Sequence, residues 1–389
     1  MLDAATDPLL DTPKDPARPE PKPYSEMRLL PRTLPALLLL VLAASATLGS
    51  CDSVPASRGD AVWLGTGTTN TWVRADATEQ EVERMLAELD SHGIRRLFAN
   101  IGVVNHDATA IIGEEERPPV STAELARFLG FVAAYEAKRS GARFTLLAGI
   151  CVANGEPVGD WPACDTESPA VRDRLAAYAV RILGVSSAGA PARSFDGLHL
   201  DIEPAGGDEL FERSVAVVRA VRRLAPHAEL SLASPRILSE WDGPRERRWY
   251  WTPDQYRAAA ALVSELSPMV YVPPDRISHD FTVESYQSYV REQAVSIARA
   301  LSDTQTTISI GVPTYWQTDG AHHEQMDLRN TLLALNSALA DLCHSDPRAL
   351  RRITGVSLFW YEKLAGNDAL WQQYLRLRAD DTEARPSGR

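Results

Sequence analysis

The chain of 389 residues lacks several patterns that would assign it to common classes of protein. It has no run of Lys and Arg, and its formal net charge is −12, which argues against a nucleic-acid partner. No glycine-rich dinucleotide fingerprint follows the first predicted strand. No Cys and His spacing matches a zinc site, and the adjacent His322 and His323 are interpreted as solvated loop residues. We therefore expect no cofactor, no bound metal and no nucleic acid.

The sequence also lacks the run of about 20 apolar residues that a membrane span requires. The apolar run over 34–48 is shorter, contains Pro35 and follows Arg28 and Arg32, which is the pattern of an export signal rather than of a transmembrane anchor. We predict a signal peptide over 27–50. Residues 1–26 are rich in proline and charge, so they are predicted to be disordered or to precede the true start of translation.

Cysteine is scarce, with four in the chain. Leu48-Gly49-Ser50-Cys51 resembles the lipobox of bacterial lipoproteins, and the resemblance implies that Cys51 is lipidated and becomes the N-terminus. Residues 51–60 would then be a tether, and the protein would lie in the cell envelope, in the periplasm or on the outer surface, held to the membrane by its lipid alone. In that oxidising compartment Cys151 and Cys164, which flank a short loop, are predicted to form a disulfide.

Strand and helix patterns alternate over residues 61–378, and residues 379–389 form a polar tail. Helix starts carry recognisable caps, among them Ser121 with Glu124 and the dipeptides Ser168-Pro169 and Thr252-Pro253. Eight strands alternating with eight helices predict an α/β fold, a single (β/α)8 TIM barrel behind the lipoprotein signal segment. The predicted strands cover 61–64, 94–101, 144–150, 195–204, 229–234, 269–272, 307–312 and 353–360.

The fourth strand alternates apolar residues with His199, Asp201 and Glu203. A period of two places these three polar side chains on one face of the strand. Residues 204–207 end the strand at once, so Asp201 and Glu203 are predicted at its C-terminal end, where a barrel keeps its chemistry. The alternative is that the two acids simply cap a loop.

Seven of the nine tryptophans fall at predicted strand ends or in the loops that follow them. Indole planes stack on the apolar faces of pyranose rings, whose hydroxyls bind carboxylates, so these loops predict a saccharide cleft. About half of these tryptophans are expected to pack the loops instead. The seven are Trp72, Trp161, Trp241, Trp249, Trp251, Trp316 and Trp360.

Asp196-Gly197-Leu198-His199-Leu200-Asp201-Ile202-Glu203 resembles the DGxDxDxE signature on the fourth strand of family 18 glycoside hydrolases, the chitinase-like barrels. Met269-Val270-Tyr271 resembles the sixth-strand M-x-Y motif of that family, and residues 355–360 resemble its eighth strand. The resemblance implies that Glu203 is the general acid and that Asp201 orients the substrate's 2-acetamido group, whose carbonyl oxygen is the nucleophile. It also implies that Tyr271 binds that group and that Trp360 stacks under the sugar.

Two positions depart from the family pattern. His199 stands where the family has an Asp, and we expect its imidazole to hold Asp201 ionised. Val272 stands where chitinases have an Asp. Both departures concern the substrate, whereas the proton donor Glu203 is present.

Three functions are consistent with these residues. The first is a glycoside hydrolase acting on glycan that contains N-acetylhexosamine; the second is a lectin-like glycan-binding barrel; the third is a structural envelope lipoprotein. Arg236, after the fifth strand, would either bind an anionic group of the ligand or pair with a strand-four acid. The residues predicted to contact substrate are His199, Trp360, Arg236, Trp241, Trp316 and Asn100.

Overall fold

The computed structural model describes residues 59–65, 71–109, 111–112, 120–139, 143–189, 192–238, 249–270, 282–314 and 326–384. All of them belong to one unit, Ser50–Arg389. The predicted segments 1–26 and 27–50 lie outside the described residues, as do four predicted site residues: Cys51, Trp241, Tyr271 and Trp316.

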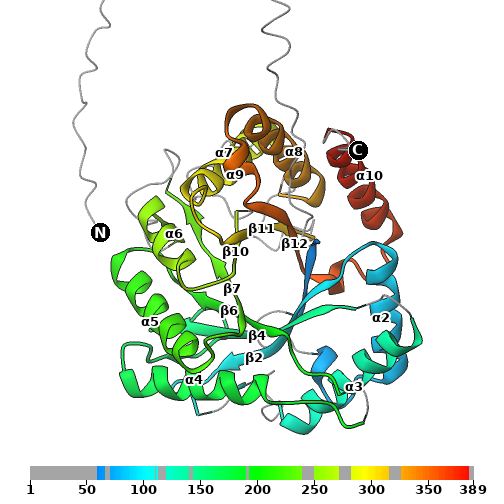
Figure 1. The fold of residues 1–389 in the computed structure, drawn as a ribbon, viewed down its shortest axis with the longest axis vertical. Helices are drawn as coiled ribbons and strands as arrows, with labels where there is room; N and C mark the ends of the chain where they lie inside the picture. The colour runs from blue at the N-terminus through cyan, green and yellow to red at the C-terminus, as the bar shows by residue number, and fades with distance from the viewer. Residues whose placement is uncertain are drawn as a thin grey trace, which may run out of the picture. The chain divides into compact units, whose positions relative to one another are not determined.

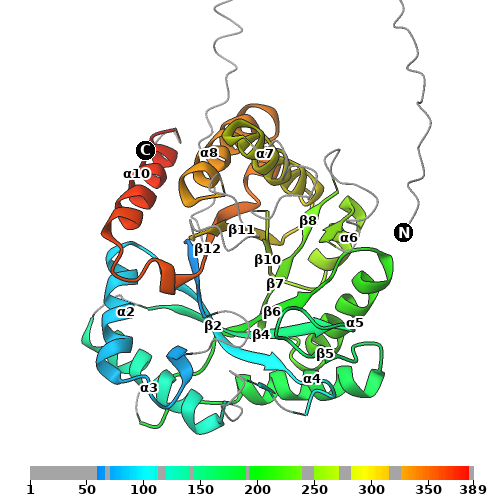
Figure 2. The same cartoon turned by 180° about the vertical axis from the view of Figure 1, so that it is seen from behind.

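Within the described residues, eight parallel strands close into a barrel (Figures 1 and 2). Each strand pairs with the next one around the barrel, and β1 closes the ring by pairing with both β2 and β12. This arrangement confirms the predicted (β/α)8 TIM barrel. In order around the ring the strands are β1 (Ala61–Leu64), β2 (Arg96–Val104), β4 (Thr145–Asn154), β6 (Gly197–Glu203), β7 (Glu229–Ser234), β10 (Glu265–Pro268), β11 (Thr307–Pro313) and β12 (Ile353–Phe359).

A helix follows each barrel strand and covers the outside of the ring (Figure 1). The last helix continues past residue 378, where the sequence predicted the start of a polar tail. These helices are α2 (Glu79–Ser91), α3 (Thr122–Lys138), α4 (Pro169–Leu183), α5 (Asp208–Leu224), α6 (Pro253–Ala260), α7 (Val283–Ala300), α8 (Leu328–Ser345) and α10 (Asp368–Ala384). The connections contain α9 (Pro347–Leu350), η1 (Thr71–Val73), η4 (Tyr361–Lys363), β3 (Ile111–Ile112), β5 (Ala163–Cys164), β8 (Arg236–Ile237) and β9 (Tyr250–Trp251). No helix among the described residues is both long and apolar enough to cross a bilayer.

Two apolar layers follow from the alternation along each strand. The outward residues Leu198, Leu200 and Ile202 of β6 share one buried cluster with Val215 and Val218 of α5. Each such side chain contributes about 1.5–3 kcal/mol when it leaves water. The inward residues form a smaller cluster of their own, so the barrel has a filled interior: Ala61, Trp63, Phe98, Leu147 and Ala233.

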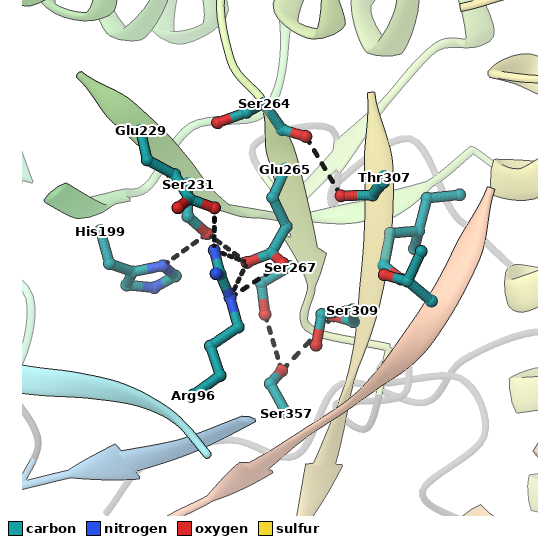
Figure 3. A network of polar contacts seen from close by, with 12 residues as sticks. Arg96, His199, Glu229, Ser231, Ser264, Glu265, Ser267, Thr307, Ser309 and Ser357 are labelled. Carbon is teal, nitrogen blue, oxygen red and sulfur yellow. Dashed lines mark hydrogen bonds and ion pairs between the residues drawn. The ribbon is translucent and has the colours of Figure 1, made fainter. Parts of the chain in front are cut away.

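The predicted sixth strand is wrong in position. The sequence placed it at Met269–Val272, of which Tyr271 and Val272 lie outside the described residues. β10 covers Glu265–Pro268, and beyond it the backbone N–H of Met269 donates to the carbonyl of Ser234 at 2.9 Å. β10 pairs with β7 from Glu265 onward. A charged residue begins this strand because Arg96 meets Glu265 inside the barrel (Figure 3), and hydropathy alone cannot reveal such a partner.

The predicted disulfide is also wrong, because neither Cys151 nor Cys164 is disulfide-bonded and both are buried. In the ladder Cys164 lies opposite Asn154, three residues beyond Cys151 on β4. That offset is about 10 Å along the strand, whereas a disulfide needs Cα atoms within about 7 Å of each other. The two thiols also belong to different layers, since Cys164 is part of the outer core and Cys151 packs with Val103 and Ala153.

The cap of α3 gives a stability prediction with an internal control. The Ser121 hydroxyl accepts from the backbone N–H of Glu124, and the Glu124 carboxylate accepts from the backbone N–H of Ser121. Ser168 holds the same N-cap position on α4 but makes no side-chain capping bond. We expect Ser121→Ala to lower the free energy of unfolding by about 1 kcal/mol and Ser168→Ala to change it by less than about 0.5 kcal/mol. Urea unfolding would measure both, and equal losses would contradict the assignment.

Candidate active site

The acid pair lies where β6 reaches the C-terminal end of the barrel. β6 pairs with β7 only from Gly197 to Leu200, whereas its ladder with β4 continues until Asp201 faces Cys151 and Glu203 faces Ala153. Asp201 and Glu203 therefore lie beyond the last pair of β6 with β7, where β6 is still paired with β4 on its other side. They are joined by a hydrogen bond, which confirms that the alternation on this strand brings the acids together.

Burial controls the charge of this pair. Asp201 is 4% exposed, and its pKa is raised well above its ordinary value, first by loss of solvent and then by the negative charge of Glu203. Burial also raises the pKa of Glu203 to about 7, although the hydrogen bond from Asp201 acts in the opposite direction. One carboxyl group of the pair therefore holds a proton near neutral pH, which is what a general acid requires.

Asn100 and Cys151 line the wall beside Asp201. The Asn100 Oδ1 atom accepts from the backbone N–H of Gly102 at 3.1 Å and lies 3.6 Å from the Cys151 sulfur, which is 4.0 Å from Asp201 Oδ2. Both side chains are buried. Asn100 was predicted to contact the substrate, but it packs inside the wall behind Asp201. The place of Cys151 beside Asp201 was missed, because the sequence assigned this thiol to a disulfide after a third strand that was predicted to end at residue 150. Nowhere in the described residues do three or more His, Cys, Asp or Glu side chains form a group that could hold a metal.

Trp360 follows β12 directly and is half-buried at the mouth of the barrel. It packs against the inner cluster that contains Trp63 and Phe98. Its carbonyl accepts from the Thr314 hydroxyl at 2.8 Å, and the Lys363 ammonium lies 5.3 Å from its ring centroid. Trp360 therefore lies at the same end of the barrel as the acid pair, and its stacking under a sugar stays a prediction.

His199 does not play the predicted part. It is fully buried, so it cannot contact a substrate, and its ring stacks on Phe98 at 4.0 Å while Nδ1 bonds the Ser231 hydroxyl at 2.9 Å. Burial, with a further contribution from the positive charge of Arg96, lowers the pKa of His199 well below its ordinary value. A neutral imidazole cannot hold Asp201 ionised, so that expectation is wrong.

Arg236 is buried as well. It lies in β8, which pairs with β9 through Arg236 and Tyr250, and it is 5% exposed. The structure therefore places it inside the connection between β7 and α6. It is not an exposed rim residue that could meet a ligand without rearrangement.

Among the described residues, the tryptophans that follow the barrel strands divide between packing and exposure, as expected. Trp251 is fully buried and donates to the Ala205 carbonyl at 2.7 Å, and Trp161 is buried against Cys151. Trp72 is half-buried and donates to Glu362 at 2.8 Å. Trp249 is 37% exposed. Of the five that the structure describes, two are therefore buried, while Trp72, Trp249 and Trp360 keep part of their surface exposed.

Comparison with known proteins bears on the fold. No protein-family model matches the sequence, and no curated protein is similar to it. Solved structures are similar. The Group IV chitinase of Ostrinia furnacalis in complex with allosamidin has a TM-score of 0.50 at 13% identity, over 83% of this chain and 99% of that chain. The ICChI chitinase of Ipomoea carnea has a TM-score of 0.46 at 14% identity, over 82% of this chain and 99% of that chain. The spore cortex-lytic enzyme SleL of Bacillus megaterium QM B1551 has a TM-score of 0.47 at 14% identity, over 85% of this chain and 75% of that chain. The likeness is one of fold, and the chemistry must be argued from this chain's own residues.

Proposed function

We propose that the protein is a glycoside hydrolase that acts on glycan containing N-acetylhexosamine. The observation that carries the proposal is the buried pair of Asp201 and Glu203 at the C-terminal end of β6, with the pKa of Glu203 raised to about 7. A merely structural acid pair at this position would be expected to be solvated or paired with a cation. A fixed indole at the same mouth, Trp360, supports a sugar as the ligand.

In the proposed reaction protonated Glu203 donates its proton to the glycosidic oxygen as the bond to the sugar breaks. The acetamido carbonyl oxygen of the same sugar attacks its anomeric carbon, and Asp201 orients that group through its carboxyl. Glu203, now a carboxylate, then takes a proton from the water that opens the cyclic intermediate. Tyr271, the predicted partner of the acetamido group, lies outside the described residues.

The decisive experiment mixes the domain from Asp52 onward with chitooligosaccharides and, separately, with peptidoglycan fragments. Mass spectrometry of the products is compared with the same reaction by Glu203→Gln. Cleavage that the variant lacks supports the hydrolase and identifies its substrate class. Saturable binding to a glycan without cleavage would favour the lectin-like barrel, and neither binding nor cleavage would favour the structural lipoprotein.

The pH dependence of turnover follows from the protonation of Glu203. The protonated form is active. It makes up half of the protein at a pH equal to the pKa of about 7, and well above that pH its fraction falls about tenfold for each further pH unit. We therefore expect kcat/KM to decline as the pH rises through about 7. Initial rates over a pH series would test this, and a rate that stays constant well above that pH would contradict the assignment of Glu203 as the acid.

We further propose that the protein is exported and anchored by a lipid on Cys51. The support is the sequence alone: the basic residues Arg28 and Arg32, the apolar run 34–48 and the Leu48–Cys51 motif. A full-length Cys51→Ala variant should lose the added mass of the lipid and leave the membrane fraction, whereas Cys164→Ala should keep both. Intact-protein mass spectrometry and fractionation would measure this, and an unmodified Cys51 would refute the anchor.

A further inference from the structure

The barrel holds the backbone of Glu203 on one side only. The ladder between β6 and β7 ends at Leu200, whereas β4 still pairs with Glu203 through Ala153. β6 ends at Glu203, and the chain continues through residues 204–206 as a buried loop. The position of the proposed acid therefore depends on the groups that hold this loop.

Asn154, the last residue of β4, is one of these groups. Its side chain is fully buried. Its Nδ2 atom lies 2.9 Å from the Pro204 carbonyl oxygen, 3.0 Å from the Leu210 carbonyl oxygen and 3.1 Å from the Ser214 hydroxyl. Its Oδ1 atom accepts from the Thr166 hydroxyl. One amide group thus joins β4, the loop after β6, the first turns of α5 and the connection that precedes α4.

These partners fix the direction of the amide. A carbonyl oxygen can only accept, so the nitrogen must face Pro204 and Leu210, and the oxygen is left for the Thr166 hydroxyl. A second side chain holds the next carbonyl of the same loop, since the buried Trp251 donates from Nε1 to Ala205 at 2.7 Å. Buried backbone carbonyls need such partners, and this loop takes two of them from side chains of β4 and β9.

We propose that Asn154 is a positioning residue for the general acid, because it ties the Pro204 carbonyl, and with it the backbone of Glu203, to β4 and α5. Asn154 is fully buried, so it acts on the reaction through Glu203. The carboxyl group must stand within hydrogen-bond reach of the glycosidic oxygen, and a displacement of about 1 Å costs about a hundredfold in rate.

Two substitutions around the same amide separate positioning from the loss of a buried hydrogen bond. Asn154→Leu keeps the shape of the side chain but removes the donor to Pro204, whereas Thr166→Val removes only the partner of Oδ1. This inference rests on the proposed function, so for the hydrolase we expect Asn154→Leu to lower kcat about tenfold to a hundredfold with KM changed less than about threefold. Thr166→Val should keep kcat within about twofold. Equal losses of kcat would overturn the proposal.

Asn154→Asp is the milder variant if the apolar side chain prevents folding, which circular dichroism would show. Its carboxyl group keeps the acceptor for Thr166 but offers at most one hydroxyl in place of two N–H groups. At least one of the carbonyls of Pro204 and Leu210 therefore loses its donor from residue 154. We expect kcat at least about threefold below that of Thr166→Val. A kcat equal to that of Thr166→Val would contradict the role of Asn154.

A titration without turnover keeps the inference testable if no glycan is cleaved. Among the described residues, the pKa of Glu203 depends on its burial and on its bond to Asp201. With carbon-13 in the glutamate carboxyl groups, the signal of Glu203 is identified by its loss in Glu203→Gln. We expect its midpoint at about pH 7 in the wild type and in Thr166→Val. In Asn154→Leu solvent reaches the loosened end of β6, so the midpoint should fall by about one pH unit or more.

The two kinds of failure are distinguishable. A midpoint that stays unchanged in Asn154→Leu would overturn the positioning role even in an active enzyme. A lack of turnover by the wild type, with the midpoint lowered in Asn154→Leu alone, would refute the hydrolase and leave the hold on Glu203 supported.

Discussion

Glu203→Gln should abolish glycan cleavage while leaving glycan binding within about twofold. The amide has the shape of the carboxyl group but no acidic proton, and a positioned general acid contributes about 10²–10⁴-fold to the rate. The effect is expected to be large because burial raises the pKa of Glu203 to about 7, and because Glu203 is hydrogen-bonded to Asp201. Single-turnover rates and equilibrium binding would separate the two quantities.

The matched control for this prediction is Glu212→Gln on α5. Glu212 is 66% exposed and forms a long contact of 3.8 Å with Arg219, so its substitution makes the same exchange of carboxyl for amide without touching the barrel mouth. We expect the control to keep full activity. If Glu203→Gln retained more than a tenth of the wild-type rate, the proton donor would have to be another group.

Arg96→Met should lower the free energy of unfolding by about 3–5 kcal/mol. Arg96 is 3% exposed and stands between Glu265, which is 1% exposed, and Glu229. Removing one partner of a buried ion pair leaves an uncompensated charge in a medium of low polarity, which is among the most costly single changes known in a protein core. Urea unfolding followed by circular dichroism would measure the loss.

An exposed ion pair provides the control for that change. Arg223 and Asp173 are 63% and 64% exposed and lie 2.8 Å apart, so Arg223→Met should cost less than about 1 kcal/mol. The double variant Arg96→Met, Glu265→Gln should recover part of the stability, because it removes the orphaned charge as well. Equal costs for Arg96→Met and Arg223→Met would show that solvent reaches the bottom of the barrel.

The local patterns of the sequence were sufficient for most of the elements. Strands β1 and β7 lie at the predicted residues, and the capping box at Ser121 begins α3 as predicted. These features depend on contacts within one strand or one turn, where alternation and capping bonds act between near neighbours. The same holds for Asp201 and Glu203, since a period of two places them on one face whatever the rest of the chain does.

Only the tertiary structure decided what those inward faces meet. β10 begins at a charged Glu265 because Arg96, far away in the chain, neutralises it inside the ring. Cys151 lies beside Asp201 because β4 and β6 pair in that register, and the same ladders keep it away from Cys164. His199 looks like a site residue in the sequence, yet Phe98, Ser231 and Arg96 bury it and keep it neutral. The sequence by itself therefore determined the number and order of the strands and helices and the face that the alternating residues of β6 take, whereas it misplaced β10. Charge state, pairing and exposure depended on side chains from other strands, because in a closed barrel every inward group is surrounded by partners that are distant in the chain.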